Sequence, residues 1–262
     1  MQVRRSYADT PFGQIHFAEC GTGTPVLFLH QTPRSWTEYI DVLPLAGRHV
    51  RAIAMDTLGF GQSARTSQTF SIELFADGVA ALLDALSLER VAVAGHHTGA
   101  VIALETAARH PERVEALVLS AMPLVTPERR LLVRDRPPID HVDPDPDGGH
   151  LTELWRRRGA FYEKGEEAHL TRCVIDALGV IDRVEEGHVA VNEYPMEERI
   201  PLVSAPVHLI CGAGDGYSMP DQERLADLLG AAFRPIDGAG VSLPEQRPDA
   251  FADEVVKFVT AR

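Results

Sequence analysis

Cysteine is scarce in this chain, and no apolar run is long enough to cross a membrane. The three cysteines, Cys20, Cys173 and Cys211, are odd in number and lack the spacing of metal ligands. No uninterrupted apolar stretch reaches about 18 residues. Residues 1–7 lead into a polar, hairpin-like segment rather than the apolar core of a signal peptide. These absences predict a protein of the reducing cytoplasm that is neither exported nor membrane-spanning.

Positive charge is also under-represented. The chain has 25 Lys and Arg residues against 38 Asp and Glu residues, a net charge of -13. Such a balance favours solubility and opposes general binding to nucleic acid or to anionic membranes. At 262 residues and 45% hydrophobic, the chain is large enough for a single domain with a sizeable core. We therefore expect a small-molecule substrate rather than a nucleic-acid or membrane partner.

Short apolar runs alternate with helical patterns along most of the chain. The runs typical of strands are residues 26–29, 50–55, 114–119, 207–211 and 233–236. Helical patterns at 71–86 and 221–229 separate some of them. This alternation predicts parallel βαβ units with a ligand crevice at the carboxyl ends of the strands. The residues expected there are His30, Gln31, Asp56, His97, Met122, Asp215 and Val241.

The most informative motif is Gly95-His96-His97-Thr98-Gly99. It has the frame of a G-x-S-x-G nucleophile elbow, a sharp turn that lifts one side chain above a parallel sheet. The preceding residues 90–94 are typical of a buried strand, and residues 100–109 have helical spacing. His97 stands where that motif has its nucleophilic serine.

Five motifs in the same order resemble the α/β-hydrolase superfamily. They are Leu29-His30 with residues 31–36, the D-x-x-G-x-G-x-S pattern within 55–63, and the segments 109–114, 212–215 and 238–248. The resemblance implies an α/β fold with a mostly parallel sheet, helices on its faces and a helical cap. It places the core at 1–123 and 204–262 and the cap at 124–203.

Composition changes within the expected cap. Residues 136–149 are too rich in proline, aspartate and glycine for a helix and predict a surface loop or hinge. Helical patterns follow at 151–164 and 166–183. Their apolar side chains are expected to pack on the core, with a few lining a substrate pocket.

Two departures from the family pattern bear on chemistry. His97 replaces the nucleophile, Val241 replaces the catalytic histidine, and Asp215 remains at the position of the triad acid. Without the serine and its proton acceptor, the usual serine mechanism is not available. We expect His97 to approach Asp215 directly or through one water, as a dyad in which His97 acts as base or nucleophile. The alternatives are that Asp215 only caps its loop and that His97 is chemically silent.

Further site residues follow from the resemblance. The backbone N–H groups of Gln31 and Thr98 are expected to bind an anionic oxygen. Arg34 is either a partner for a substrate carboxylate or a solvated charge, and Trp36 is either a pocket wall or a core residue.

Histidines 30, 96 and 97 do not form a convincing metal site, because adjacent histidines on a tight turn point apart. His30 lies in the same oxyanion loop and is expected to be a structural hydrogen-bonding residue there. We therefore expect neither a metal nor a cofactor.

Three functions are compatible with this pattern. The first, favoured by resemblance, is a hydrolase that acts on a small ester, lactone or activated carbon–carbon bond. The second is a lyase, isomerase or decarboxylase that transfers a proton in the same pocket. The third is a catalytically silent protein that binds a small ligand.

Overall fold

A single sheet of eight strands organises the protein. The computed structural model describes residues 1–261. The strands are β1 (Arg4–Thr10), β2 (Gly13–Cys20), β3 (Pro25–Leu29), β4 (Arg51–Met55), β5 (Val91–His96), β6 (Val114–Ser120), β7 (Val207–Gly212) and β8 (Ala232–Ile236). Their order in the sheet is β1-β2-β4-β3-β5-β6-β7-β8. The β1–β2 hairpin and the β2–β4 pair are antiparallel, and all other pairs are parallel. The mostly parallel sheet is the one that the sequence predicts.

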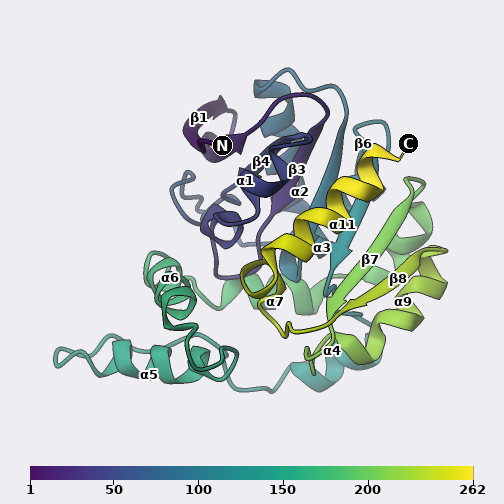
Figure 1. Cartoon of the computed structure of the whole chain (residues 1–262). Helices are drawn as coiled ribbons and strands as arrows, with labels where there is room; N and C mark the ends of the chain where they lie inside the picture. Colours follow the sequence, from purple (N-terminus) through teal and green to yellow (C-terminus); the bar gives the residue numbers. More distant parts are fainter. Residues whose placement is uncertain (262) are drawn as a thin grey trace.

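Helices cover both faces of this sheet. Outside residues 124–203 they are η1 (Trp36–Tyr39), α1 (Leu43–Ala46), α2 (Ile72–Ala85), α3 (Thr98–Arg109), η3 (Met219–Asp221), α9 (Gln222–Leu229), α10 (Leu243–Gln246) and α11 (Pro248–Thr260). Figure 1 shows α11 crossing in front of the sheet. Among the described residues, no helix is both long and apolar enough to span a membrane.

Buried side chains separate into two clusters by strand alternation. Leu27 and Leu29 of β3 contribute to a cluster that includes residues of α2, α3 and α9. Val26 and Phe28 contribute to a second cluster, which includes residues of α1 and α11. Because successive strand residues point to opposite faces, a sheet covered on both sides needs apolar residues at nearly every position. This requirement explains the continuous apolar runs in the sequence.

Between β6 and β7 the chain forms a helical insertion, residues 124–203. Its helices are α4 (Pro127–Val133), α5 (Gly149–Gly159), α6 (Glu167–Leu178), α7 (Glu186–Glu193), α8 (Met196–Arg199) and η2 (Ile200–Leu202). Helix α7 contacts α3 and α4, whereas α5 pairs with α6. Figure 1 shows α5 and α6 projecting beyond one end of the sheet, with the loop before α5 at the tip.

The carboxyl ends of the parallel strands meet at one edge of the sheet. Strand β3 leads into His30, β5 into His97 and β7 into the loop that contains Asp215. Segments far apart in the sequence therefore converge at this edge, as expected for a ligand crevice in an open α/β sheet.

Candidate functional site

The turn between β5 and α3 holds His97 in a strained backbone conformation. Its φ is 45° and its ψ is -111°, a region that residues with a Cβ rarely adopt. The flanking glycines are required sterically: a Cβ at Gly95 would lie 2.2 Å from the carbonyl oxygen of Gly99, and one at Gly99 would lie 1.9 Å from that of Leu29. Strand, turn and helix thus pack too closely for any larger residue at either glycine.

His97 faces Asp215 across the edge of the sheet. Its Nε2 lies 3.1 Å from Oδ2 of Asp215, at ion-pair distance but outside the geometry of a regular hydrogen bond. The other carboxylate oxygen accepts the backbone N–H groups of Tyr217 and Ser218, at 2.9 and 3.0 Å. Asp215 is fully buried, whereas the His97 side chain is 16% exposed. The acid is therefore fixed by its own loop, and the imidazole is the accessible member of the pair.

The surroundings of Asp215 stabilise its ionised form. Burial by itself would raise the pKa of this carboxyl, but the contact with His97 and the two backbone N–H groups lower it below its usual value. An ionised carboxylate beside Nε2 favours a proton on that nitrogen. Nδ1 of His97 is then the atom left to accept a proton, and the hydroxyl oxygen of Ser218 lies 3.5 Å from it.

His96 has a structural role beside the elbow. It is fully buried, and its Nε2 donates to the carbonyl oxygen of Val241 at 2.8 Å. Nδ1 therefore carries a lone pair and accepts the hydroxyl of Ser120 at 2.9 Å. Burial and the neighbouring His97 hold the pKa of His96 well below its ordinary value. The neutral ring ties the elbow to the loop that contains Val241.

The expected pair of oxyanion donors is not complete. The backbone N–H of Gln31 donates to the Glu38 carboxylate at 2.9 Å, and the Gln31 side-chain amide donates to the same group at 2.7 Å. Burial raises the pKa of Glu38 to about 7, although Arg34 and the Gln31 N–H oppose that shift. The Gln31 N–H is thus engaged within its own loop, contrary to expectation.

Thr98 remains as a possible oxyanion donor. It is the first residue of α3, where backbone N–H groups have no partner within the helix. Its hydroxyl accepts the backbone N–H of Thr32 at 3.3 Å. Thr98 thus joins the elbow to the loop after β3.

Arg34 is a buried structural residue, which corrects the sequence interpretation. Its side chain is 1% exposed, and its two terminal nitrogens donate to Glu245 at 2.7 and 3.0 Å. Its Nε donates to Asp176 at 3.0 Å. Neither the free cation for a substrate carboxylate nor the solvated charge is observed. The partners lie on α10 and α6, far away in the sequence, so local pattern could not reveal them.

His30 and Trp36 lie outside the cavity next to His97. Nδ1 of His30 donates to the Gln31 carbonyl at 2.8 Å, and its Nε2 accepts the Thr57 N–H at 3.0 Å. Burial lowers the pKa of His30. The neutral ring holds its loop in place through these two hydrogen bonds. Trp36 packs in the core cluster that contains α11. Of the two interpretations offered for Trp36, the core residue is the one observed.

A cavity of about 150 Å³ adjoins the elbow. Core residues and residues of the insertion line it together: Gln31, Thr32, His97, Thr98, Pro123, Arg129, Ile139, Arg158, Phe161, His188, Val191, Asn192, Tyr217, Ser218 and Val241. Sequence reasoning identified Gln31, His97 and Thr98 but missed Ser218, although Ser218 follows Asp215 by three residues. It also missed Arg129, Arg158 and His188. Arg129 and His188 lie outside the helical patterns predicted from the sequence, and the pattern at 151–164 does not tell that Arg158 meets the cavity.

A buried ion cluster supports the insertion side of the cavity. The Arg158 guanidinium contacts both carboxylate oxygens of Asp140, and Nε2 of His188 lies 2.7 Å from Asp140 Oδ2. Asp140 is fully buried, and although burial would raise its pKa, Arg158 and His188 lower it to about 2. The carboxylate of Glu185 accepts the N–H groups of residues 139–141. Three segments of the insertion are thereby fixed to one another.

A family model of the α/β-hydrolase fold matches residues 24–181. The chain belongs to this family. A haloalkane dehalogenase from Agrobacterium fabrum is 35% identical over 114 residues, which are 43% of this chain and 38% of the dehalogenase. A 2-hydroxymuconate semialdehyde hydrolase from Pseudomonas is 36% identical over 105 residues, 38% of this chain and 37% of the hydrolase. The chain thus matches well under half the length of these curated relatives.

Solved structures agree with the fold over the full chain. The enol-lactonase of Burkholderia xenovorans LB400 aligns with a TM-score of 0.78 and 22% identity, covering 97% of this chain and 100% of the lactonase. An epoxide hydrolase, CorEH, aligns with a TM-score of 0.75 and 20% identity, covering 100% of both chains. At these identities the likeness establishes the shared architecture.

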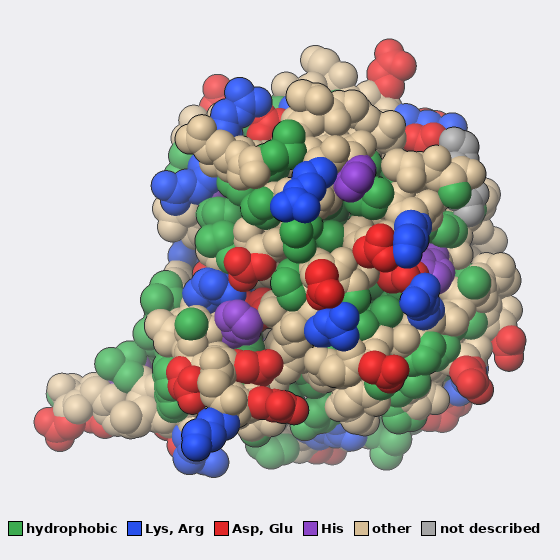
Figure 2. All heavy atoms as spheres, in the orientation of Figure 1, with side chains coloured by type: hydrophobic (Ala, Val, Ile, Leu, Met, Phe, Trp, Pro, Cys, Tyr) green, Lys and Arg blue, Asp and Glu red, His purple; other side chains and the backbone are tan. Residues whose placement is uncertain are grey.

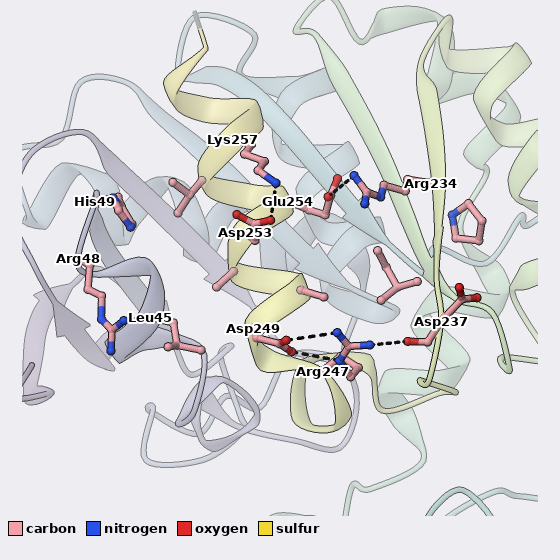
Figure 3. A pocket seen from close by; sticks show the side chains of 15 residues that line it. Leu45, Arg48, His49, Arg234, Asp237, Arg247, Asp249, Asp253, Glu254 and Lys257 are labelled. Atoms are coloured by element: carbon pink, nitrogen blue, oxygen red, sulfur yellow. Dashed lines mark hydrogen bonds and ion pairs between the residues drawn. The ribbon is translucent and has the colours of Figure 1, made fainter.

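A larger hollow on this α/β-hydrolase chain lies away from the elbow. It measures about 790 Å³ and lies between α1, β8 and α11. Figure 3 shows its charged side chains paired with one another: Arg247 with Asp249, Arg234 with Glu254, and Lys257 with Asp253. The smaller cavity contains the elbow residue and the strand ends. We therefore place the candidate site there.

Proposed function

We propose that the chain is an enzyme of the hydrolase class that acts on a small carbonyl compound, with His97 as general base and Asp215 as its orienting acid. The 3.1 Å approach of His97 Nε2 to Asp215 Oδ2 is the observation that carries this proposal. A second support is the positive φ of His97, since strained conformations tend to persist at functional sites. The names of the relatives, a haloalkane dehalogenase and a 2-hydroxymuconate semialdehyde hydrolase, agree with small substrates.

The proposed reaction starts with neutral His97, whose Nε2–H faces the Asp215 carboxylate. Nδ1 takes a proton from a water molecule, and the water oxygen adds to the substrate carbonyl carbon. The carbonyl oxygen becomes an oxyanion near the first turn of α3, where the Thr98 N–H lies. The imidazolium then returns its proton to the leaving group as the tetrahedral intermediate collapses. Asp215 stabilises the imidazolium and fixes the ring orientation.

We also propose that the insertion, residues 124–203, acts as the cap over this site. Arg129, Ile139, Arg158, Phe161 and His188 line the cavity that contains His97. An apolar wall with a few polar groups is the usual lining of a small-molecule site. A cap in this position would keep bulk water away from the reacting carbonyl.

The same base could serve a lyase, isomerase or decarboxylase if Nδ1 removed a proton next to a carbonyl. A silent ligand-binding protein is the other candidate, and one observation favours it. The Gln31 N–H is engaged with Glu38, which removes one donor from the expected oxyanion site.

Turnover of small esters, lactones and 1,3-diketones by variants tests the proposal. We expect His97→Ala to lower kcat/KM by ~10²–10⁴-fold, the usual contribution of general-base catalysis. Asp215→Asn should lower it less and leave the fold intact. His49→Ala changes an exposed histidine outside this cavity and should leave turnover unchanged.

Isotope incorporation separates the alternatives. Hydrolysis should place ¹⁸O from labelled water in the acid product, whereas lyase or isomerase products should carry none. A rate that neither substitution changes would contradict the role of His97. A bound ligand without any product would favour the silent binder.

A further inference from the structure

The cavity beside His97 presents basic groups to its contents. The chain carries 38 Asp and Glu residues against 25 Lys and Arg residues. Yet the described residues that line this cavity include Arg129, Arg158, His97 and His188 and neither aspartate nor glutamate. The nearby carboxylates of Asp140 and Asp215 are fully buried behind these side chains. A ligand would therefore meet guanidinium and imidazole groups, and no carboxylate, on the charged part of the wall.

Three of these four basic groups already have a carboxylate. Arg158 and His188 share Asp140, and His97 faces Asp215. Arg129 differs. Its closest acidic contact is Asp221, with Nη1 3.9 Å from Oδ2, and the Arg129 and Asp221 side chains are 30% and 34% exposed. Among the described residues, its buried Nε has no hydrogen-bond partner.

The cost of this arrangement shows in the electrostatics of Arg129. Burial lowers the pKa of its guanidinium below the usual value, and Asp221 does not fully offset that effect. A buried N–H donor without an acceptor is unfavourable, because its lost hydrogen bond to water is not replaced. An anion in the cavity would supply the missing acceptor. Arg134, at the end of the same helix, is exposed and does not line this cavity.

We propose that the substrate is a small carboxylate and that Arg129 binds its carboxylate group. This inference rests on the proposed function only in placing the reacting carbonyl of the same molecule beside His97. A planar guanidinium matches the two oxygens of a carboxylate. Asn192, which lines the same wall, can add a neutral hydrogen bond.

The cavity favours a carboxylate over a phosphate. Its volume is about 150 Å³, and Pro123, Ile139 and Val191 contribute apolar surface. A phosphate dianion presents three acceptor oxygens and more charge than one guanidinium neutralises. The second arginine, Arg158, is already bound to Asp140 through both of its carboxylate oxygens. Arg129 is thus one cation in a lining whose other groups are neutral or already paired, and this arrangement fits a singly charged acid.

Ligand-observed NMR on the intact protein tests the proposal without requiring turnover. The probes are acetate, propanoate, 4-oxopentanoate and benzoate, each paired with its methyl ester. We expect at least one acid to bind more tightly than its ester. Arg129→Gln should weaken that binding about 10- to 100-fold, the loss of a charge-assisted hydrogen bond. Arg134→Gln, the matched control, should leave it unchanged.

Two further variants keep the result interpretable. Arg129→Lys retains the charge and should retain part of the binding, provided that circular dichroism shows a native fold. His97→Ala should lower turnover ~10²–10⁴-fold but keep carboxylate binding. Failure of the proposed chemistry and failure of this inference therefore give different results. Acids that bind no better than esters, or equal binding by Arg129→Gln and wild type, would overturn it. Tighter binding of inorganic phosphate than of every acid would also overturn it.

Discussion

The packing around the elbow holds residue 97 in its strained backbone conformation. A residue with a Cβ at a φ of 45° costs on the order of 1–3 kcal/mol, which the surrounding packing must supply. The close approach of Gly95 to Gly99 and of Gly99 to Leu29 provides that packing. The turn would therefore hold a serine or a histidine in the same position. What changes is reach: the longer imidazole contacts Asp215 without an intermediary.

A serine-directed fluorophosphonate probe should leave the elbow unlabelled. Such probes phosphonylate an activated hydroxyl with loss of fluoride, and residue 97 offers no hydroxyl. We expect mass spectrometry of the treated protein to show no stoichiometric adduct on residues 95–99. Thr98 is the first residue of α3, and its hydroxyl already accepts the Thr32 N–H. We therefore expect no activation of this hydroxyl by a base.

Ser218 is the residue that could contradict this expectation. Its Oγ lies 3.5 Å from Nδ1 of His97, and its side chain lines the cavity. A rapid adduct on Ser218 that is absent in Ser218→Ala would identify a relocated nucleophile. The catalytic groups would then be Ser218, His97 and Asp215, and the mechanism in which His97 activates a water molecule would be wrong. Ser67→Ala, outside this cavity, serves as the control.

Residues next to strand ends were predictable, and residues whose partners lie far away in the chain were not. The approach of His97 to Asp215 follows from two parallel strands that end at one edge, and the structure places them 3.1 Å apart. Arg34 could not be assigned, because Glu245 and Asp176 come from α10 and α6. Nor could the sequence show that Glu38 occupies the Gln31 N–H.

At the scale of elements, the close contact between β3 and the start of α3 fixes the position of the elbow relative to the sheet. A Cβ at Gly99 would lie 1.9 Å from the backbone carbonyl of Leu29, which has no side-chain freedom to move away. We expect Gly99→Ala to lower the free energy of unfolding by about 1–3 kcal/mol or more, as overpacking does. Urea denaturation followed by circular dichroism measures this change.

Gly159→Ala is the matched control for that substitution. Its added Cβ would meet a side-chain carbon of Leu170 at 3.6 Å, an ordinary van der Waals contact, at the end of α5. Alanine also has a higher helix propensity than glycine. We expect stability that is unchanged or slightly raised. Equal loss in both variants would mean that the elbow glycine is not sterically required.

Elements of the core were easier to predict than those of the insertion. The apolar run 26–29 predicts a strand within one residue of β3 (Pro25–Leu29), because both faces of the sheet demand apolar residues. In the insertion, the pattern at 166–183 extends beyond α6, which ends at Leu178 before Gly179. The pattern at 151–164 likewise passes Gly159, where α5 ends. These helices still contribute buried apolar residues to the core, among them Leu154 of α5 and Leu170 and Val174 of α6.

At the scale of the whole molecule, charge is distributed as local pairs despite the net charge of -13. Figure 2 shows acidic and basic side chains interspersed over one face. Exposed pairs of this kind contribute little to stability. The buried cluster of Asp140, Arg158 and His188 differs, because it joins α5, α7 and the loop before α5. Its titration should therefore show in the stability of the entire protein.

Asp140→Asn tests this link through the pH dependence of unfolding. The pKa of Asp140 is about 2 in the folded protein, below the value of about 3.9 for an unfolded chain. A lowered acid pKa stabilises the fold above the unfolded value, and that contribution, about 2 kcal/mol, disappears as pH falls from about 4 to 2. At pH 7 the variant should lose about 3–5 kcal/mol, since Arg158 stays buried without its partner. The difference in unfolding free energy from wild type should shrink by about 2 kcal/mol toward pH 2.

Asp143→Asn is the control, because its side chain lies in the same loop and is 94% exposed; it should match wild type at every pH. If the difference in unfolding free energy between wild type and Asp140→Asn were independent of pH, the cluster would stabilise the fold through packing rather than through its charges.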